Sequence, residues 1–230
     1  MSSHTGRAVC TVVLVHSPLV GALTWADTAT ELEGQGLTTV VVDLAGANDH
    51  AAIVRSVTAA SRHKVRTPIV LVGHSGAGRH LPGLAVTQPE TALLVYVDAS
   101  LAAPGRSWFD DAPPDLARTL RGLADDGGRL PPWNEWFPAD ALAGLLPDPD
   151  LRRRFVAGLP RLPLSYFAEP APAATWTGPA VYIQLSDAYR DEADRLAAAG
   201  VPVIGRPSHH LAMLTDPAMV ADAIRTAIAT

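Results

Sequence analysis

Ile69-Val70-Leu71-Val72-Gly73-His74-Ser75-Gly76-Ala77-Gly78 is an apolar run that passes into a glycine-rich turn. The run from 69 to 73 is short and unbroken by polar residues, which is typical of a strand buried on both faces. The stretch from 76 to 86 has helical spacing. We therefore predict a strand, a tight turn at Ser75 and then a helix, which Pro82 should kink or shorten near its start.

Apolar runs of the same kind recur along the chain and alternate with stretches of helical spacing. We predict strands at Ala8–Val15, Thr39–Leu44, Ile69–Gly73, Ala92–Asp98, Ala180–Leu185 and Val201–Ile204. Helices are expected at Trp25–Glu33, His50–Arg62, Gly76–Val86, Asp187–Ala199 and Pro217–Ile228. This alternation predicts a three-layer α/β fold in which helices flank a mostly parallel, twisted sheet.

The interval from about Leu101 to Gly178 breaks this alternation. It is rich in proline, which cannot serve central strands, and short helices are expected at Asp115–Asp125, Asp140–Leu146 and Leu151–Ala157. All four Phe and four of the five Trp fall between residues 108 and 176. We therefore divide the chain into a core, residues 1–100 and 179–230, and a helical cap, residues 101–178, inserted after the strand that ends at Asp98.

Composition limits the classes of partner. The 230 residues are 48% hydrophobic, enough for one sizeable core, and carry a formal net charge of -5. Without a basic field, a small-molecule partner is expected rather than nucleic acid or a membrane. Cys10 has no internal disulfide partner, and the apolar run before His16 is too short for a signal peptide or a membrane span. We expect a cytoplasmic protein, and nothing indicates its oligomeric state.

Ser75 stands where a nucleophile would stand in a strand-turn-helix arrangement. Such a nucleophile elbow needs small neighbours and a helix N-terminus aimed at developing negative charge. The pattern G-x-S-x-G is met at Gly73 and Ser75, while Ala77 replaces the last glycine. A phosphate loop is disfavoured because Arg79 and His80 stand where Lys and Ser or Thr are needed. A glycine-rich turn without chemistry is the other alternative.

A histidine pair follows the last predicted strand, where the base stands in a chain ordered nucleophile, acid, base. The segment Ser208-His209-His210-Leu211-Ala212-Met213-Leu214, with Pro217, resembles the G-D-H-x-A-M-L-x-x-P ending of the methylesterase and hydroxynitrile lyase branch of the α/β-hydrolase superfamily. Leu14-Val15-His16-Ser17-Pro18, with Gly21, Ala22 and Trp25, is similar to the same branch. The resemblance implies an α/β-hydrolase fold, with Ser75 as nucleophile and His210 as base.

The acid that would orient His210 has two candidates. Asp98 ends a predicted buried strand, where a carboxylate needs hydrogen bonds, and some lipases take their acid from this position. Asp187 follows the next strand, which is the commoner place, but it lies close to His210 in the sequence and beside helix signals. We favour Asp98 and keep two alternatives open, Asp187 and a site without an acid.

The remaining histidines are given supporting uses. His209 is expected to serve a surface or capping role, like His4, His50 and His63, and His16 is expected to support the loop after the first strand. No H-E-x-x-H or similar ligand spacing occurs in the sequence, so neither a metal site nor a cofactor is expected.

The loop after the first strand departs from the esterase pattern. In esterases of the resembled branch, a backbone N–H in H-G-x pairs with the N–H after the nucleophile, here on Gly76, to bind the oxyanion. The matching residue is Pro18, which has no N–H, so Leu19 or the Ser17 hydroxyl would have to replace it. We also count His74, which precedes the nucleophile, among the residues expected to bind the oxyanion or the substrate.

These observations favour a serine hydrolase that cleaves an ester, thioester or lactone of a hydrophobic small molecule. Because of Pro18, the alternatives are a lyase or cyclase that uses the Ser/His pair for proton transfer, and a ligand-binding protein with little turnover. Leu211 stands where hydroxynitrile lyases have Lys, so cyanide chemistry is not expected. We expect aromatic side chains of the cap to roof the pocket, about half of them packing the cap's own core. They are Trp108, Phe109, Trp133, Trp136, Phe137, Phe155, Tyr166 and Phe167.

Overall fold

The computed structural model describes residues 10–62, 67–138 and 140–230. In this part of the chain, one sheet of six strands has the order β2-β1-β3-β4-β5-β6, and neighbouring strands are parallel. The strands are β1 (Thr11–Val15), β2 (Thr38–Val42), β3 (Ile69–His74), β4 (Thr91–Val97), β5 (Ala180–Gln184) and β6 (Val203–Gly205). The six predicted strands are confirmed. Ala8 and Val9, at the predicted start of the first strand, lie outside the described residues, as do His4 and His63.

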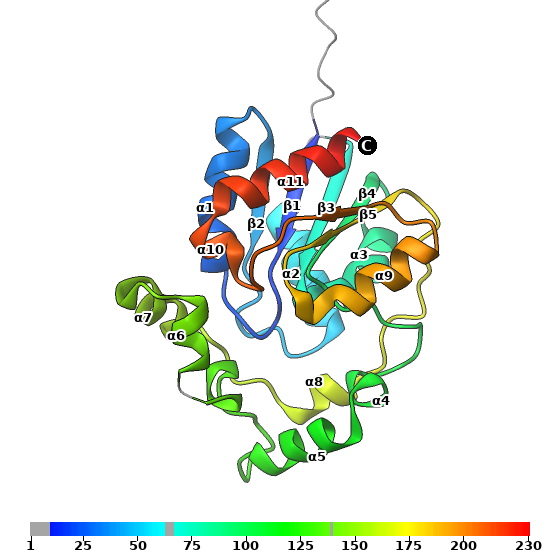
Figure 1. Ribbon diagram of the computed structural model, residues 1–230. Helices are drawn as coiled ribbons and strands as arrows, with labels where there is room; N and C mark the ends of the chain where they lie inside the picture. Colours follow the sequence, from blue (N-terminus) through cyan, green and yellow to red (C-terminus); the bar gives the residue numbers. More distant parts are fainter. Residues whose placement is uncertain (1–9, 63–66, 139) are drawn as a thin grey trace, which may run out of the picture.

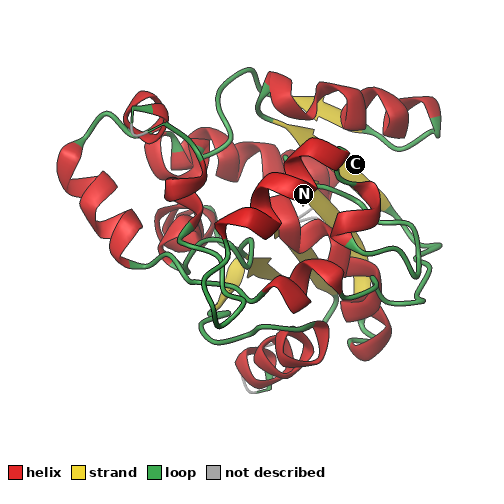
Figure 2. Cartoon of the chain, turned by 90° about the horizontal axis from the view of Figure 1, so that it is seen from below, coloured by secondary structure: helices red, strands yellow, loops and turns green. Residues whose placement is uncertain are grey.

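Helices cover both faces of the sheet (Figure 1 and, from below, Figure 2). The helices on one face are α2 (His50–Ser61), α3 (Leu81–Thr87) and α9 (Arg190–Ala198), and those on the other are α1 (Leu23–Gly34) and α11 (Pro217–Ala229). Successive strand residues alternate between the two cores, with Val13 and Val15 in the first and Val12 and Leu14 in the second. The prediction of a three-layer α/β fold is therefore confirmed.

The strand register brings the carboxyl ends of the central strands to one edge of the sheet. Val15 of β1 lies beside Gly73 of β3, and Val97 of β4 lies beside Ile183 of β5. The residues that follow these strands therefore meet at this edge. In open α/β sheets, ligands bind outside the carboxyl ends of the strands.

The segment between β4 and β5, residues 98–179, leaves the sheet at this edge and returns to the neighbouring strand. We call it the insertion. In Figure 1 its helices lie below the ends of the strands. They are α4 (Trp108–Asp111), α5 (Pro114–Leu123), α6 (Ala141–Leu145), α7 (Pro149–Ala157) and α8 (Leu164–Ala168), with the 3-10 turn η2 (Trp133–Trp136). An apolar cluster that includes Leu142, Phe155 and Leu211 joins α6 and α7 to the core. The treatment of residues 101–178 as a separate cap stays a prediction.

Proline explains two local features of the elements. β6 begins at Val203 rather than at Val201, because Pro202 has no N–H to donate to the sheet. The helix after β3 begins as the 3-10 turn η1 (Ser75–His80), and α3 follows with Pro82 in its first turn, so the α-helix is shorter than an unbroken one, as predicted. Within the described ranges, no helix combines the length and the apolar character that a membrane span requires.

Candidate active site

Ser75 lies at the sharp turn between β3 and η1. Its φ of 54° is left-handed, a conformation that costs a non-glycine residue about 1–3 kcal/mol and persists where the surroundings hold it. The Ser75 carbonyl accepts a hydrogen bond from the Ser100 N–H at 3.2 Å. A Cβ on Gly78 would lie 2.7 Å from the Ser100 carbonyl oxygen, so this close approach requires glycine at position 78. The turn thus presents Ser75 at the carboxyl edge of the sheet.

Asp98, directly after β4, contacts His210. The Nδ1–H of His210 donates to Oδ2 of Asp98 at 3.0 Å, and the carboxylate is fully buried. Asp98 also accepts from the Leu185 N–H at 2.7 Å and from the N–H and hydroxyl of Ser186. Burial acts to raise the pKa of Asp98, but the hydrogen bonds from His210, Ser186 and Leu185 outweigh it and lower the pKa. The carboxylate therefore stays ionised, fixes the His210 proton on Nδ1, and leaves Nε2 as an acceptor.

Asp187, the other candidate acid, does not lie beside His210. It begins the 3-10 turn η3 (Asp187–Tyr189), its side chain is 87% exposed, and its carboxylate pairs with Arg190. Asp98 follows its strand directly and is buried, whereas the chain after β5 has already turned into η3 when it reaches Asp187. Of the two candidates, the structure brings Asp98 to His210.

His74 does not line the cavity beside Ser75, so its predicted place in the substrate-binding group is corrected. Its fully buried ring lies 4.5 Å from the ring of His210, centre to centre, and its Nε2–H donates to the His210 carbonyl at 3.0 Å. Side chains alternate along β3, and this one faces Trp25 of α1. Burial and the neighbouring His210 hold the pKa of His74 well below its usual range. His74 therefore supports the backbone of His210.

His16 and His209 hold chain segments near the site. The Nδ1–H of buried His16 donates to the Ser17 carbonyl at 2.8 Å, and its Nε2 accepts from the Leu44 N–H at 3.1 Å. The Nε2–H of His209 donates to the Thr215 hydroxyl at 2.8 Å. Burial lowers the pKa of both rings. These contacts agree with the supporting roles predicted for both residues.

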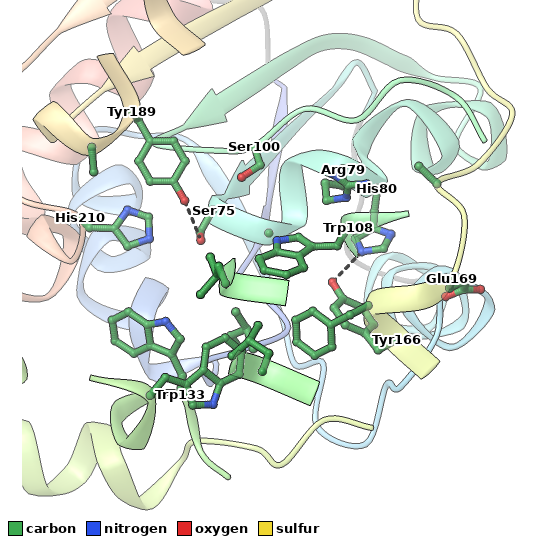
Figure 3. Close-up of a pocket in the computed structure, with 18 of the residues that line it drawn as sticks. Ser75, Arg79, His80, Ser100, Trp108, Trp133, Tyr166, Glu169, Tyr189 and His210 are labelled. Atoms are coloured by element: carbon green, nitrogen blue, oxygen red, sulfur yellow. Dashed lines mark hydrogen bonds between the residues drawn. The ribbon is translucent and has the colours of Figure 1, made fainter. Parts of the chain in front are cut away.

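Tyr189, at the end of η3, contacts both Ser75 and His210 and was not predicted (Figure 3). Its hydroxyl lies 3.4 Å from Ser75 Oγ, and its ring stacks on the His210 ring with 4.9 Å between centres and 6° between planes. Burial raises the pKa of Tyr189, although hydrogen bonds with Ser75 and Ser100 act to lower it. In the described part of the chain, Tyr189 rather than His210 is the hydrogen-bond partner of the Ser75 hydroxyl.

The loop after β1 lies against Gly76. The Leu19 N–H donates to Ser17 Oγ at 3.3 Å. A Cβ on Gly76 would lie 3.2 Å from the same Oγ and 3.7 Å from Cδ of Pro18. Ser17 and Pro18 are buried, whereas Leu19 and Gly76 line the cavity. The four predicted residues therefore lie together. The Leu19 N–H is taken by the Ser17 oxygen, whose own O–H remains free to donate.

A cavity of about 370 Å³ lies over Ser75, a size typical of small-molecule sites. Ser75, Gly76 and His210 form part of its wall, and the four aromatic residues predicted to bind substrate line it with others of the insertion. These side chains are Trp108, Trp133, Trp136, Phe137, Tyr166, Phe167, Leu116 and Leu120. Phe109 and Phe155, also expected in the roof, are not among the lining residues; Phe155 is buried between α6, α7 and the core.

Polar side chains on the side of the cavity away from His210 were not predicted (Figure 3). Arg79, which is buried, pairs with Asp111 of α4 at 2.9 Å, and Glu169 lies beyond Tyr166. His80 contacts His50 through their Nδ1 atoms at 3.0 Å, so half-buried His50 has an internal contact instead of the expected surface or capping use. The insertion creates this cluster by folding back on α2 and η1, which no local pattern signals. Within the described ranges, no three His, Cys, Asp or Glu side chains are grouped as a metal site requires.

The fold, with a serine at the elbow and a histidine-aspartate pair beside it, is that of an alpha/beta hydrolase. The chain belongs to the alpha/beta hydrolase family, whose family model matches residues 12–223. A search of curated proteins found no match.

Solved structures give more particular likenesses. An extracellular alpha/beta-hydrolase from a Paenibacillus species, described as sharing structural and functional homology with tobacco salicylic acid binding protein 2, has a TM-score of 0.75 at 21% identity, over 95% of this chain and 98% of that one. The pyrethroid hydrolase PytH has a TM-score of 0.73 at 22% identity, over 95% and 97%. Tomato methylketone synthase I, solved with 2-tridecanone, has a TM-score of 0.70 at 17% identity, over 96% and 98%. The α/β-hydrolase fold and the resemblance seen in the sequence are confirmed.

Proposed function

We propose that the protein is a serine hydrolase that cleaves an ester, thioester or lactone of a hydrophobic small molecule. The observation that carries the proposal is the hydrogen bond between buried Asp98 and His210, in the wall of the cavity that also contains Ser75. Membership of the alpha/beta hydrolase family supports a hydrolase. The aromatic wall supports a hydrophobic substrate, and one similar structure is a pyrethroid hydrolase while another holds a long-chain ketone.

In the proposed reaction, Ser75 Oγ attacks the carbonyl carbon while its proton passes to Nε2 of His210. Asp98 keeps the imidazole in the productive tautomer and stabilises the imidazolium, and the Gly76 N–H donates to the oxygen that becomes negative. His210 then protonates the leaving group. Water attacks the acyl-enzyme in the same way, releasing an acid and restoring Ser75. Before the first step, the Ser75 hydroxyl must leave Tyr189 and turn to His210.

A fluorophosphonate, which phosphonylates activated serines, tests this proposal. We expect one adduct on the wild-type protein, measured by intact mass and located on Ser75 by peptide mapping. Ser75→Ala should abolish the adduct. Ser208→Ala, which removes an exposed serine hydroxyl in the loop that carries His210, should leave the adduct unchanged. No adduct on the wild type, or an adduct that survives Ser75→Ala, would count against the hydrolase.

A non-hydrolytic lyase or cyclase is the second candidate, favoured by the contacts of Ser17 and Tyr189. Pro18 has no backbone N–H with which to bind an oxyanion. The Ser17 hydroxyl lies beside Gly76, and the Tyr189 hydroxyl is hydrogen-bonded to Ser75. In such a reaction Ser75 and His210 would move protons without forming an acyl-enzyme.

Turnover in oxygen-18 water separates the two candidates. Reaction of a panel of hydrophobic esters, thioesters and lactones, followed by mass spectrometry, should place one label in each acid product if the protein is a hydrolase. An unlabelled product that forms at the same rate in Ser75→Ala would instead exclude the acyl-enzyme route.

A further inference from the structure

Pro18 leaves the proposed oxyanion site with the Gly76 N–H as its one backbone donor of the expected pair. A side-chain donor lies close to this point. Tyr166 of α8 lines the cavity together with Ser75 and Gly76, and a Cβ on Gly76 would lie 4.0 Å from the Tyr166 hydroxyl. Two donors to one oxygen each stand about 2.7–3.0 Å from it. An oxygen held by the Gly76 N–H is therefore within reach of Tyr166.

The Tyr166 hydroxyl contacts His80, and the His80 ring stacks on the ring of His50 (Figure 3 shows the contact between Tyr166 and His80). Its oxygen lies 3.0 Å from Nε2 of His80, and Nδ1 of His80 lies 3.0 Å from Nδ1 of His50. The two imidazole rings are 5.3 Å apart and 18° from parallel. The His50 backbone N–H donates to the Glu169 carboxylate at 2.8 Å, which fixes this end of α2 against the insertion. Both ring nitrogens of His80 therefore have a partner, so the orientation of Tyr166 is well defined.

The direction of these hydrogen bonds depends on what occupies the cavity. Burial, with the neighbouring His50 and Arg79, lowers the pKa of His80 to about 3, so its ring is neutral and donates from one nitrogen only. When His50 donates to Nδ1 of His80, Nε2 of His80 donates to the Tyr166 oxygen, and the Tyr166 O–H is free to donate into the cavity. The reverse arrangement directs that O–H to His80. A carbonyl oxygen, which only accepts, selects the first arrangement.

We propose that the Tyr166 hydroxyl is the second oxyanion donor of this site, in place of the backbone N–H that Pro18 lacks, and that His80 and His50 position it. The assignment rests on the proposed serine hydrolase. Burial raises the pKa of Tyr166, so the hydroxyl keeps its proton and acts as a hydrogen-bond donor, not as an acid that gives the proton away. The insertion would then contribute directly to the reaction as well as covering the cavity.

The rate of inactivation by a fluorophosphonate tests the assignment, because the phosphoryl oxygen of the probe occupies the oxyanion position when Ser75 attacks. Loss of one oxyanion donor slows turnover roughly 100- to 1000-fold. We expect Tyr166→Phe to slow inactivation about 100-fold. The matched control is Tyr96→Phe, which removes a buried hydroxyl outside the cavity wall and should react at the wild-type rate. Thermal melts of all variants show whether each is folded.

A double-variant cycle tests the positioning role of His80. His80→Gln keeps a polar side chain of similar reach but cannot bridge His50 and Tyr166 in the same way, so inactivation should slow by less than in Tyr166→Phe. Because His80 acts through Tyr166, the double variant should react no more slowly than Tyr166→Phe alone. A merely structural contribution of His80 would instead add its own loss.

Each outcome decides between these assignments. Adduct formation on Ser75 with an unchanged rate in Tyr166→Phe would overturn the Tyr166 assignment and leave the hydrolase proposal standing. A wild type that forms no adduct would overturn the hydrolase proposal, and the Tyr166 assignment with it. A multiplied loss in the double variant would overturn the positioning role of His80.

Discussion

Asp98 carries a negative charge that has no access to solvent. A buried carboxylate is tolerated only when hydrogen bonds replace its hydration. The side chain of His210, the N–H of Leu185, and the N–H and hydroxyl of Ser186 supply them. Three of these four donors belong to Leu185 and Ser186, which follow β5, so pairing of β4 with β5 creates the environment that keeps Asp98 ionised. The orientation of His210 therefore depends on the sheet as much as on one contact.

Asp98→Asn is expected to lower the rate of fluorophosphonate adduct formation by roughly 10³- to 10⁴-fold, since an amide can hold the imidazole in the wrong tautomer. Asp187→Asn is the matched control, because it removes an exposed carboxylate of the same region, and should react like the wild type. Kinetics of both purified variants check this. Similar losses in the two variants, or a loss confined to Asp187→Asn, would contradict the placement of the acid.

Tyr189 provides a second prediction at this scale, because its hydroxyl and its ring do different things. Tyr189→Phe removes the hydrogen bond to Ser75 but keeps the stacking on His210. A hydrogen bond contributes about 0.5–1.5 kcal/mol, so freeing Ser75 should speed adduct formation by about 2- to 10-fold. Tyr189→Ala, which also removes the stack, should slow it. Slower reaction of Tyr189→Phe would show that the hydroxyl assists the reaction.

The sequence allowed Ser75, His210 and the two candidate acids to be predicted, but not the choice between the acids. Asp98 and Asp187 both follow buried strands, and only the fold shows that one is enclosed while the other is exposed beside Arg190. Tyr189 could not be found in this way, because its role depends on the turn η3 bringing its ring over His210. The prediction that His74 binds substrate was wrong, because its position at the end of β3 does not show toward which face of the sheet its side chain points.

At the level of elements, the strands, the long helices and three helices of the insertion, α5, α6 and α7, were predicted, whereas other short elements were not. Continuous apolar runs predict the strands of the sheet. In contrast, α4, η2, α8 and the one-turn helix α10 (Ala212–Thr215) are too short for a periodic pattern to form. These short elements carry much of the cavity wall, including Trp108, Trp133 and Tyr166. The site was therefore predicted less completely than the fold.

The N-terminus of α11 offers a test of the element that follows the His210 loop. The Asp216 carboxylate accepts from the Met219 N–H at 3.2 Å, which satisfies one free N–H of the helix start. Asp216→Ala should lower the free energy of unfolding by about 1 kcal/mol. Asp222→Ala, which removes a half-exposed carboxylate inside the same helix, should change it by less than about 0.5 kcal/mol. Urea denaturation of both variants measures the difference, and equal effects would exclude a capping role.

For the molecule as a whole, buried histidines make stability depend on pH. Burial lowers the pKa values of His16, His74 and His80, the last to about 3, so all three are neutral in the folded chain. Below an ordinary histidine pKa of about 6.5, the unfolded chain binds more protons than the folded chain. The stabilisation is therefore complete above that pH and is lost as the pH falls toward the folded pKa values.

We expect the free energy of unfolding, measured by urea denaturation, to fall steadily between about pH 7 and about pH 5. His80→Gln should reduce the slope below about pH 6.5 by about 1.4 kcal/mol per pH unit, the contribution of one histidine held neutral. An unchanged slope in this variant would mean that His80 takes up protons in the folded state as readily as in the unfolded one.

β4 and β5 are parallel neighbours in the sheet, so the insertion begins at the carboxyl end of β4, where the Asp98 N–H donates to the Ile183 carbonyl, and ends at the amino end of β5, where the Pro179 carbonyl accepts from the Leu94 N–H. A crossover that joins two neighbouring parallel strands can be exchanged without altering the order of the strands. The entropy of closing such a loop grows slowly, by about 0.6 kcal/mol for each doubling of length. Ser75 and His210 lie outside the insertion and Asp98 is its first residue, so an exchange limited to residues 101–178 would keep all three, while the aromatic roof would be replaced. Replacing this one segment would thus change the substrate and remove Tyr166, the proposed second oxyanion donor, while Ser75, His210 and Asp98 stay in place.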